Sequence, residues 1–255
     1  MRARRRFGQN FLHDPGTIDR IVAAIDPRPE HTLVEIGPGH GAISRPLAAS
    51  GAGLFMVEID RDLAAELAAD PGLAAAQLHV GDALAVNFAE LSGAPRYRLL
   101  GNLPYNISTP LIFHALTQRE HMIDAHFLLQ REVVDRMAAS PGSRDFGRLS
   151  VMLQYHCDVE KCFQVAPGAF RPAPKVMSAL VRLKPREPTD PVGNVDTLGR
   201  VVSAAFGQRR KQLGNALKAL LSRGALTQLG VDPAARAEQL SVADFVKIAD
   251  AVDES

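Results

Sequence analysis

The chain has 255 residues, of which 46% are hydrophobic and 22% charged, with a formal net charge of +1 and two cysteines. At this length it buries roughly 70–75% of its unfolded surface without disulfides, and its near-average composition excludes a disordered, fibrous or coiled-coil chain. No segment suits a membrane span or a secretory signal, and two isolated thiols fit a reducing compartment, so we expect a cytoplasmic protein.

The first half of the chain alternates short apolar runs with helical patterns. The runs typical of buried strands are Thr32–Ile36, Leu54–Ile59, Gln77–Val80, Tyr97–Leu100 and Ala125–Leu129. Helical patterns lie between them at 60–69 and 109–118. Strands that alternate with helices indicate βαβ units and a parallel sheet covered on both faces. Two further runs, 159–165 and 176–183, are joined by a loop too short for a helical crossover, which predicts an antiparallel hairpin at one sheet edge.

The last quarter of the chain has a different pattern. Residues 185–193 contain several prolines and a glycine and are typical of a linker. Beyond them, apolar residues at helical spacing predict helices around 213–221 and 242–252. We therefore expect a catalytic domain over 1–184, a linker over 185–193 and a small helical domain over 194–255.

Charge is unevenly distributed along the chain. Segment 57–90 holds seven acidic residues and one arginine, whereas segments 161–186 and 197–231 each hold six basic residues and no acid. Any single run of this kind can be a solvated face. Together with the arginines at the N-terminus, the basic stretches favour a polyanion, most simply nucleic acid, as partner.

A glycine turn follows the first predicted strand. Gly37, Gly39 and Gly41 stand in G-x-G-x-G spacing, and glycines there let the backbone approach a ligand. Glu58 ends the next strand and can accept bonds from ribose hydroxyls, and Asp82 follows the third and can accept from an adenine amino group. The dinucleotide fingerprint has G-x-G-x-x-G spacing instead, so the pattern favours S-adenosylmethionine over a nicotinamide cofactor, and a simple tight turn is the plain alternative.

A second motif follows the fourth strand, at the same edge of the sheet. It reads Asn102-Leu103-Pro104-Tyr105. The lone pair of an aromatic exocyclic amine is delocalised, and accepting its hydrogens at the Asn102 side-chain oxygen and a backbone carbonyl near Leu103 makes the nitrogen more nucleophilic. Pro104 stiffens the turn and Tyr105 offers a ring for an extruded base. A proline-containing turn with a core tyrosine is the structural alternative.

A proline-rich loop between the last two predicted strands carries Phe170 beside Arg171 and Lys175. Phe170 could close the second face of the base, because stacking contributes about 1–3 kcal/mol per base. A phenylalanine buried beneath the loop is an equally good interpretation. Neither the cysteines nor the scattered histidines have metal-ligand spacing, so we expect no metal site.

These motifs resemble the ribosomal RNA adenine N6-dimethyltransferases that modify two adjacent adenines near the 3′ end of small-subunit rRNA. The resemblance extends from Arg6-Phe7-Gly8-Gln9-Asn10-Phe11-Leu12 through the glycine turn and the Asn102 motif to Ala205-Phe206-Gly207-Gln208-Arg209-Arg210-Lys211. It implies a class I Rossmann-like methyltransferase with a seven-stranded mixed sheet, in which Asn10, Leu12 and Asn102 also contact S-adenosylmethionine. It further implies a monomer that takes part in ribosome biogenesis. The basic residues expected to hold rRNA phosphates are Arg4, Arg5, Arg6, Arg171, Lys175, Arg209, Arg210 and Lys211.

Three alternatives remain beside this interpretation. Resistance enzymes that methylate large-subunit rRNA share most of the N-terminal motifs, but the basic segment 209–211 and the chain length favour the small-subunit enzyme. A binding or assembly factor on the same fold would use the basic surface without turnover. A DNA adenine methyltransferase is disfavoured by Leu103 within the motif and by the lack of a separate target-recognition domain.

Overall fold

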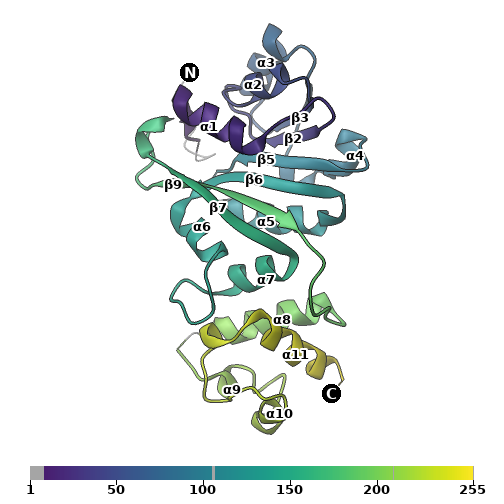
Figure 1. The fold of residues 1–255 in the computed structure, drawn as a ribbon, viewed down its shortest axis with the longest axis vertical. Coiled ribbons are helices and arrows are strands. Elements are labelled where there is room, and N and C mark those ends of the chain that lie inside the picture. The colour runs from purple at the N-terminus through teal and green to yellow at the C-terminus, as the bar shows by residue number, and fades with distance from the viewer. Residues whose placement is uncertain (1–8, 105–106, 209, 255) are drawn as a thin grey trace. The chain divides into compact units, whose positions relative to one another are not determined.

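The structure is a computed structural model that describes residues 9–104, 107–208 and 210–254 (Figure 1). The chain divides into two compact units, Met1–Val134 with Glu160–Pro185, and Asp135–Val159 with Arg186–Ser255. Among the described residues, no helix combines the length and apolar character needed to cross a membrane.

A seven-stranded mixed sheet runs in the order β4-β3-β2-β5-β6-β9-β7. Its strands are β2 (Thr32–Ile36), β3 (Gly53–Glu58), β4 (Gln77–Val80), β5 (Tyr97–Asn102), β6 (Met122–Gln130), β7 (Cys157–Val165) and β9 (Ser178–Pro185). The pairs from β4 to β6 are parallel, and β9 is antiparallel to β6. The predicted mixed sheet is thereby confirmed, and each predicted strand matches an observed one within a few residues. The strand predicted as buried over Gln77–Val80 is instead largely exposed, because β4 lies at the edge of the sheet.

Parallel pairing brings the functional motifs to one edge of the sheet. Ile36 at the end of β2 is in register with Val57 on one side and with Gly101 on the other. Glu58 pairs with Val80 at the end of β4. The segments that follow these strands therefore leave the sheet at the same end, as the carboxyl ends of an open α/β sheet do where they bind ligands.

Helices cover the sheet of the first unit. They are α1 (Pro15–Ile25), α2 (Ser44–Ala49), α3 (Arg61–Ala68), α4 (Phe88–Ser92) and α5 (Ser108–Thr117), and α6 (Arg131–Met137) follows β6. The predicted helices 60–69 and 109–118 correspond to α3 and α5. Helix α1 begins at Asp14, whose carboxylate accepts from Thr17 N–H at 2.8 Å, and it buries Ile21 and Ile25 in the main core.

A second, two-stranded sheet joins the start of the described chain to the proline-rich loop. It pairs β1 (Phe11–Leu12) with β8 (Phe170–Arg171) in antiparallel register. His13 N–H extends the ladder to the Ala169 carbonyl at 2.9 Å. Leu12, Ala169 and Phe170 are all buried in the main core, so the small sheet is anchored by apolar packing.

The second unit is helical. It contains α7 (Arg148–His156), α8 (Val195–Gly207), α9 (Leu213–Ala216), α10 (Arg223–Gln228) and α11 (Val242–Asp253). Helix α8 packs against α7 and α11, and the Phe206 ring lies 6.3 Å from that of Phe146 and 5.6 Å from that of Phe245. The expected C-terminal helical region is thus present, although the helix expected over 213–221 ends at Ala216. Residues 135–159, which the predicted division placed with 1–184, pack with the C-terminal helices because α7 shares its apolar contacts with α8 and α11.

Candidate cofactor and active site

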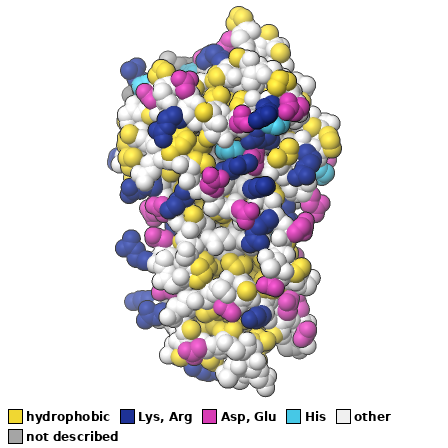
Figure 2. All heavy atoms as spheres, in the orientation of Figure 1, with side chains coloured by type: hydrophobic (Ala, Val, Ile, Leu, Met, Phe, Trp, Pro, Cys, Tyr) yellow, Lys and Arg dark blue, Asp and Glu magenta, His cyan; other side chains and the backbone are white. Residues whose placement is uncertain are grey.

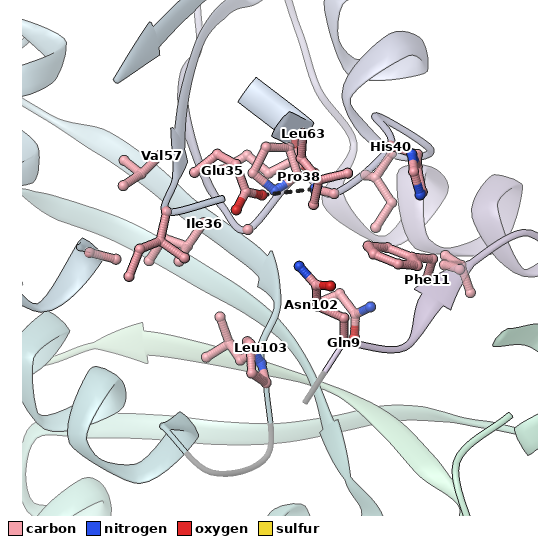
Figure 3. Close-up of a pocket in the computed structure, with 18 of the residues that line it drawn as sticks. Gln9, Phe11, Glu35, Ile36, Pro38, His40, Val57, Leu63, Asn102 and Leu103 are labelled. Atoms are coloured by element: carbon pink, nitrogen blue, oxygen red, sulfur yellow. Dashed lines mark hydrogen bonds between the residues drawn. The ribbon is translucent and has the colours of Figure 1, made fainter. Parts of the chain in front are cut away.

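A pocket opens at the carboxyl ends of β2, β3, β4 and β5 (Figure 3). It combines the glycine turn, the ends of the neighbouring strands and the segment before α1. Its lining includes Gln9, Asn10, Phe11, Leu12, Glu35, Gly37, Gly39, His40, Glu58, Ile59, Asp82, Asn102, Leu103 and Pro104. The structure therefore brings together every described residue that the sequence assigned to the cofactor, along with the described part of the Asn102 motif.

The glycine turn adopts a conformation that other residues rarely take. Gly37, Gly39 and Gly41 have φ of 66°, 59° and 73°. At Gly39 there is also no room for a side chain, since an added Cβ would lie 3.0 Å from Cδ1 of the Phe11 ring. The turn thus closes one wall of the pocket, and Phe11 and His40 lie side by side there, with ring centroids 4.4 Å apart (Figure 3).

Glu58, the last residue of β3, is 4% exposed. Its Oε2 accepts from Gly39 N–H at 3.3 Å and its Oε1 from Asp60 N–H at 2.8 Å. Burial raises the pKa of Glu58 above its ordinary value, although these backbone hydrogen bonds oppose the shift. Each carboxylate oxygen has further lone pairs, so a carboxylate held in this way can accept hydrogen bonds from a vicinal diol.

A second buried acid lies on the same pocket. Glu35 in β2 is 2% exposed, and its Oε2 has no hydrogen-bond partner among the residues that the structure describes. Burial raises the pKa of Glu35 to about 7. The negative charge of Glu58 adds to this upward shift, and the neighbouring Ser44 hydroxyl opposes it. None of the described residues that line the pocket is Lys or Arg. A pocket with two buried acids favours a cationic ligand such as a sulfonium and disfavours a pyrophosphate.

The segments that follow β4 and β3 contribute an acid and an apolar surface. Asp82 is exposed, and its Oδ1 accepts from Leu84 N–H at 3.0 Å. Ile59, next to Glu58, leaves 49% of its surface exposed and lines the pocket. An exposed isoleucine beside two acids is suited to packing against the flat face of a base.

Asn102 ends β5 and enters the pocket from the side facing the glycine turn (Figure 3). Its Nδ2 donates to the Asn10 carbonyl at 2.9 Å. Leu103 is buried and its N–H donates to the Leu128 carbonyl at 3.2 Å, while the Pro104 carbonyl accepts from Ile107 N–H at 3.1 Å. The predicted catalytic residue Tyr105 lies outside the described residues.

Phe170 is the predicted site residue that the structure does not bring to the pocket. Its side chain is 2% exposed and belongs to the main core together with Leu12. Of the two interpretations that the sequence allowed, the structure therefore has the second, in which the Phe170 ring is buried beneath the loop. Stacking of Phe170 on a base would require the loop to move.

The predicted RNA-binding residues differ in how far the structure describes them. Arg171, Lys175, Arg210 and Lys211 are exposed. Arg4, Arg5, Arg6 and Arg209 lie outside the described residues. On the face drawn in Figure 2, Lys and Arg side chains are scattered among acidic ones, so no single basic patch is evident there.

Three residues that line the pocket, Glu35, Phe11 and Ile59, lie within the motifs that the sequence shares with the family, but sequence reasoning assigned none of them a role of its own. The sequence contains a signal for Glu35. It is an acid inside an otherwise apolar strand, directly before a glycine turn, and burying an acidic side chain is unfavourable, so its presence there indicates a function. No signal distinguished Phe11 and Ile59 from core residues, since their exposure depends on the fold around them.

Comparisons with known proteins agree with this geometry. The family model described as ribosomal RNA adenine dimethylase matches residues 1–254. The chain is 54% identical, over 99% of its length and 96% of the relative's, to the ribosomal RNA small subunit methyltransferase A of Pseudomonas syringae pv. tomato. It is 51% identical to the protein of the same name from Methylococcus capsulatus, with 95% of each chain covered.

Solved structures show the same fold. A dimethyladenosine transferase from Plasmodium falciparum superposes with a TM-score of 0.80 at 25% identity, covering 93% of this chain and 95% of that one. The 23S rRNA methyltransferase ErmE superposes with a TM-score of 0.73 at 25% identity, covering 96% of this chain and all of that one (100%). With a family match over nearly its whole length, the chain belongs to the ribosomal RNA adenine dimethylase family, enzymes that methylate rRNA with S-adenosylmethionine as the methyl donor.

Proposed function

We propose that this chain transfers methyl groups from S-adenosylmethionine to N6 of two adjacent adenosines near the 3′ end of small-subunit rRNA. The placement of Asn102 at the mouth of a pocket with the features of a cofactor site is the observation that carries the proposal. The small-subunit substrate is supported by full-length relatives at 51–54% identity whose names specify that subunit. The cytoplasmic location and the monomeric state stay predictions.

Different residues of the pocket would hold different parts of the cofactor. Glu58 would accept from the ribose hydroxyls and Asp82 from the adenine amino group, and Ile59 would pack against the base. Gly37 and Gly39 would let the backbone approach the methionine part. Asn10 and Leu12, in the segment before α1, would hold the cofactor from the other side, and Glu35 would supply negative charge for its cationic groups.

The target adenine is activated by hydrogen-bond acceptors and not by a strong base. The side-chain oxygen of Asn102 accepts one hydrogen of the N6 amine. The second acceptor is a backbone carbonyl near Leu103, and the bond that the Pro104 carbonyl already accepts from Ile107 N–H favours the Leu103 carbonyl for this role. S-adenosylmethionine would supply an electrophilic methyl on its sulfonium. The two acceptors would leave the N6 lone pair free to take that methyl, and the proton that N6 loses would pass to water. In-line positioning accounts for most of the acceleration.

RNA is held by exposed basic residues outside the pocket. Arg171 and Lys175 on the proline-rich loop, and Arg210 and Lys211 beyond α8, contact phosphates, which sets register without reading bases. Arg4, Arg5, Arg6 and Arg209 belong to the same proposal from the sequence alone, as does Tyr105 as an aromatic face for the base.

The test uses radiolabelled S-adenosylmethionine with unmethylated small subunits, large subunits and naked rRNA in parallel, followed by mass spectrometry of the nucleosides. We expect N6,N6-dimethyladenosine from small subunits alone. Label in large-subunit RNA would indicate a resistance-type enzyme, and bound cofactor without label would indicate a binding factor.

The Asn102→Ala variant tests the mechanism with the same assay. It should abolish transfer while the fold and most RNA affinity remain. A matched control is Asn87→Ala. It removes an exposed asparagine that caps α4 by accepting from Ala89 and Glu90 N–H and that does not belong to the lining of the pocket. Near-normal turnover of Asn102→Ala would contradict the assigned role.

A further inference from the structure

The side-chain amide of Asn102 is oriented by main chain from the other end of the domain's sequence. Its Nδ2 donates to the Asn10 carbonyl at 2.9 Å, across 92 residues of chain. Asn10 begins a short segment, Asn10–Leu12, which we call the strap. The strap lies along the pocket and pairs with β8 through Phe11 and Leu12.

The strap is held at three points, so the position of the Asn10 carbonyl is fixed. The β1–β8 ladder holds one side, and Leu12 is buried beside Phe170 in the core. On the other side, the Phe11 ring occupies the space that a Cβ on Gly39 would need and lies 4.4 Å from the His40 ring. His40 is in turn bonded to Glu66 on α3 through Nδ1 at 2.8 Å.

The two ends of an asparagine amide have nearly the same shape but opposite hydrogen-bonding character, since the NH2 group donates and the oxygen accepts. A carbonyl can only accept, so the Asn10 carbonyl fixes the NH2 group toward the strap. The oxygen of Asn102 is then the end directed away from the strap. If the amide rotated by 180°, two acceptors would face each other within the pocket wall, which is unfavourable when partly buried.

We infer that the Asn10 carbonyl is a positioning and specificity-determining group that makes Asn102 an obligate hydrogen-bond acceptor toward the substrate. The inference deepens the proposed function and rests on it. A base with an exocyclic amine, such as adenine, donates to this oxygen. A base with a keto oxygen at the same position, such as hypoxanthine, places an acceptor against an acceptor and is rejected. The strap thereby selects amine over keto bases without touching the base.

The inference is tested by weakening the carbonyl with an ester. Phe11→phenyllactic acid turns the Asn10 carbonyl into an ester carbonyl, a poorer acceptor, and keeps the Phe11 ring. The matched control replaces His13, the residue after the strap, with its α-hydroxy analogue. This also removes one backbone N–H that pairs with the proline-rich loop, the one bonded to Ala169, but leaves the Asn10 carbonyl intact. The measurements are kcat at saturating S-adenosylmethionine, cofactor affinity, and competition by rRNA fragments with adenine or hypoxanthine at the target positions.

The unmodified protein should prefer the adenine fragment by at least about tenfold, the effect of one well-made hydrogen bond. The Phe11 ester should lower kcat by about tenfold and reduce the preference to less than about threefold, and the His13 ester should retain it. Unchanged preference in the Phe11 ester, or equal loss in both esters, would overturn the inference. Absence of dimethyladenosine from the unmodified protein would instead reject the proposed function.

A measurement on the unmodified protein covers the case in which the ester does not fold. With ¹⁵N-labelled asparagine, one of the two Nδ2 protons of Asn102 should exchange with solvent at least about tenfold more slowly than the other, because it alone is donated to a fixed carbonyl. Equal exchange of both protons would overturn the inference, whatever the activity.

Discussion

Arg98 on β5 and Asp124 on β6 form a bidentate ion pair inside the sheet, with Nε–Oδ1 at 2.8 Å and Nη2–Oδ2 at 3.0 Å. Their side chains are only 7% and 1% exposed. Arg182 on β9 also donates to Asp124, at 2.9 Å. Burial alone would raise the pKa of Asp124, but the bonds from the arginines and the charge of nearby His126 hold it below its ordinary value.

Asp124→Asn should therefore be among the most destabilising single changes to the sheet. It leaves the Arg98 guanidinium buried without a counter-charge, which costs about 3–5 kcal/mol in comparable buried pairs. The measurement is the free energy of unfolding in urea. The control, Asp26→Asn, removes an ion pair with Arg28 whose side chains are 67% and 58% exposed, and it should have a far smaller effect. Similar losses in both variants would contradict the argument.

Gly101→Ala should prevent the sheet from forming normally. A Cβ at Gly101 would lie 2.5 Å from the carbonyl oxygen of Ile36 on the neighbouring strand, and backbone cannot yield as a side-chain end can. We expect a loss of at least about 3 kcal/mol or failure to fold, measured by circular dichroism and urea unfolding. Gly199→Ala on α8 meets nothing within 4 Å, and it should stabilise the protein by about 0.5–1 kcal/mol through helix propensity. If Gly101→Ala were as stable as the wild type, the prediction would be wrong, because β2 and β5 could then move apart enough to accommodate the added Cβ.

The sheet and the cofactor pocket were predictable from the sequence because their signals are local. Each predicted strand is a short run of mostly apolar residues, the glycine turn directly follows one, and Glu58 and Asn102 lie at the ends of two others. Parallel pairing then places them together without further information. The pairing of β1 with β8 was not predictable, since two-residue strands have no periodicity.

The position of Phe170 and the grouping of residues 135–159 depend on contacts distant in sequence. A phenylalanine in a proline-rich loop has the same local sequence whether it faces a base or the core. Only the packing of Leu12 and Ala169 around it distinguishes the two. Likewise, nothing within α7 indicates that its partners are α8 and α11, more than thirty residues further along the chain.

Glu35 should make the ligand-free protein less stable as pH rises from about 4.5 to 7. Burial raises its pKa from 4.5 to about 7 in the folded protein. As pH rises, the unfolded chain therefore loses the Glu35 proton before the folded protein does. Between these two pKa values the free energy of unfolding falls, and it stops falling once Glu35 is also ionised in the folded protein. In Glu35→Gln this contribution is absent, so its stability relative to the wild type should rise by about 1.4 kcal/mol per pH unit at the steepest point. A pH-independent difference in urea unfolding between pH 4.5 and 7 would contradict the raised pKa.

Binding of S-adenosylmethionine should release a proton from Glu35 below about pH 7. A sulfonium and an ammonium near the buried carboxyl favour its charged form, so the pKa of Glu35 must fall on binding. By linkage, cofactor affinity should rise as pH increases from 5.5 to 7 and level off above. Calorimetry in buffers of different ionisation enthalpy measures the released proton directly, and Glu35→Gln should abolish both the release and the slope. Affinity that falls with rising pH, or equal proton release by Glu35→Gln, would place the charge recognition on another acid of the pocket.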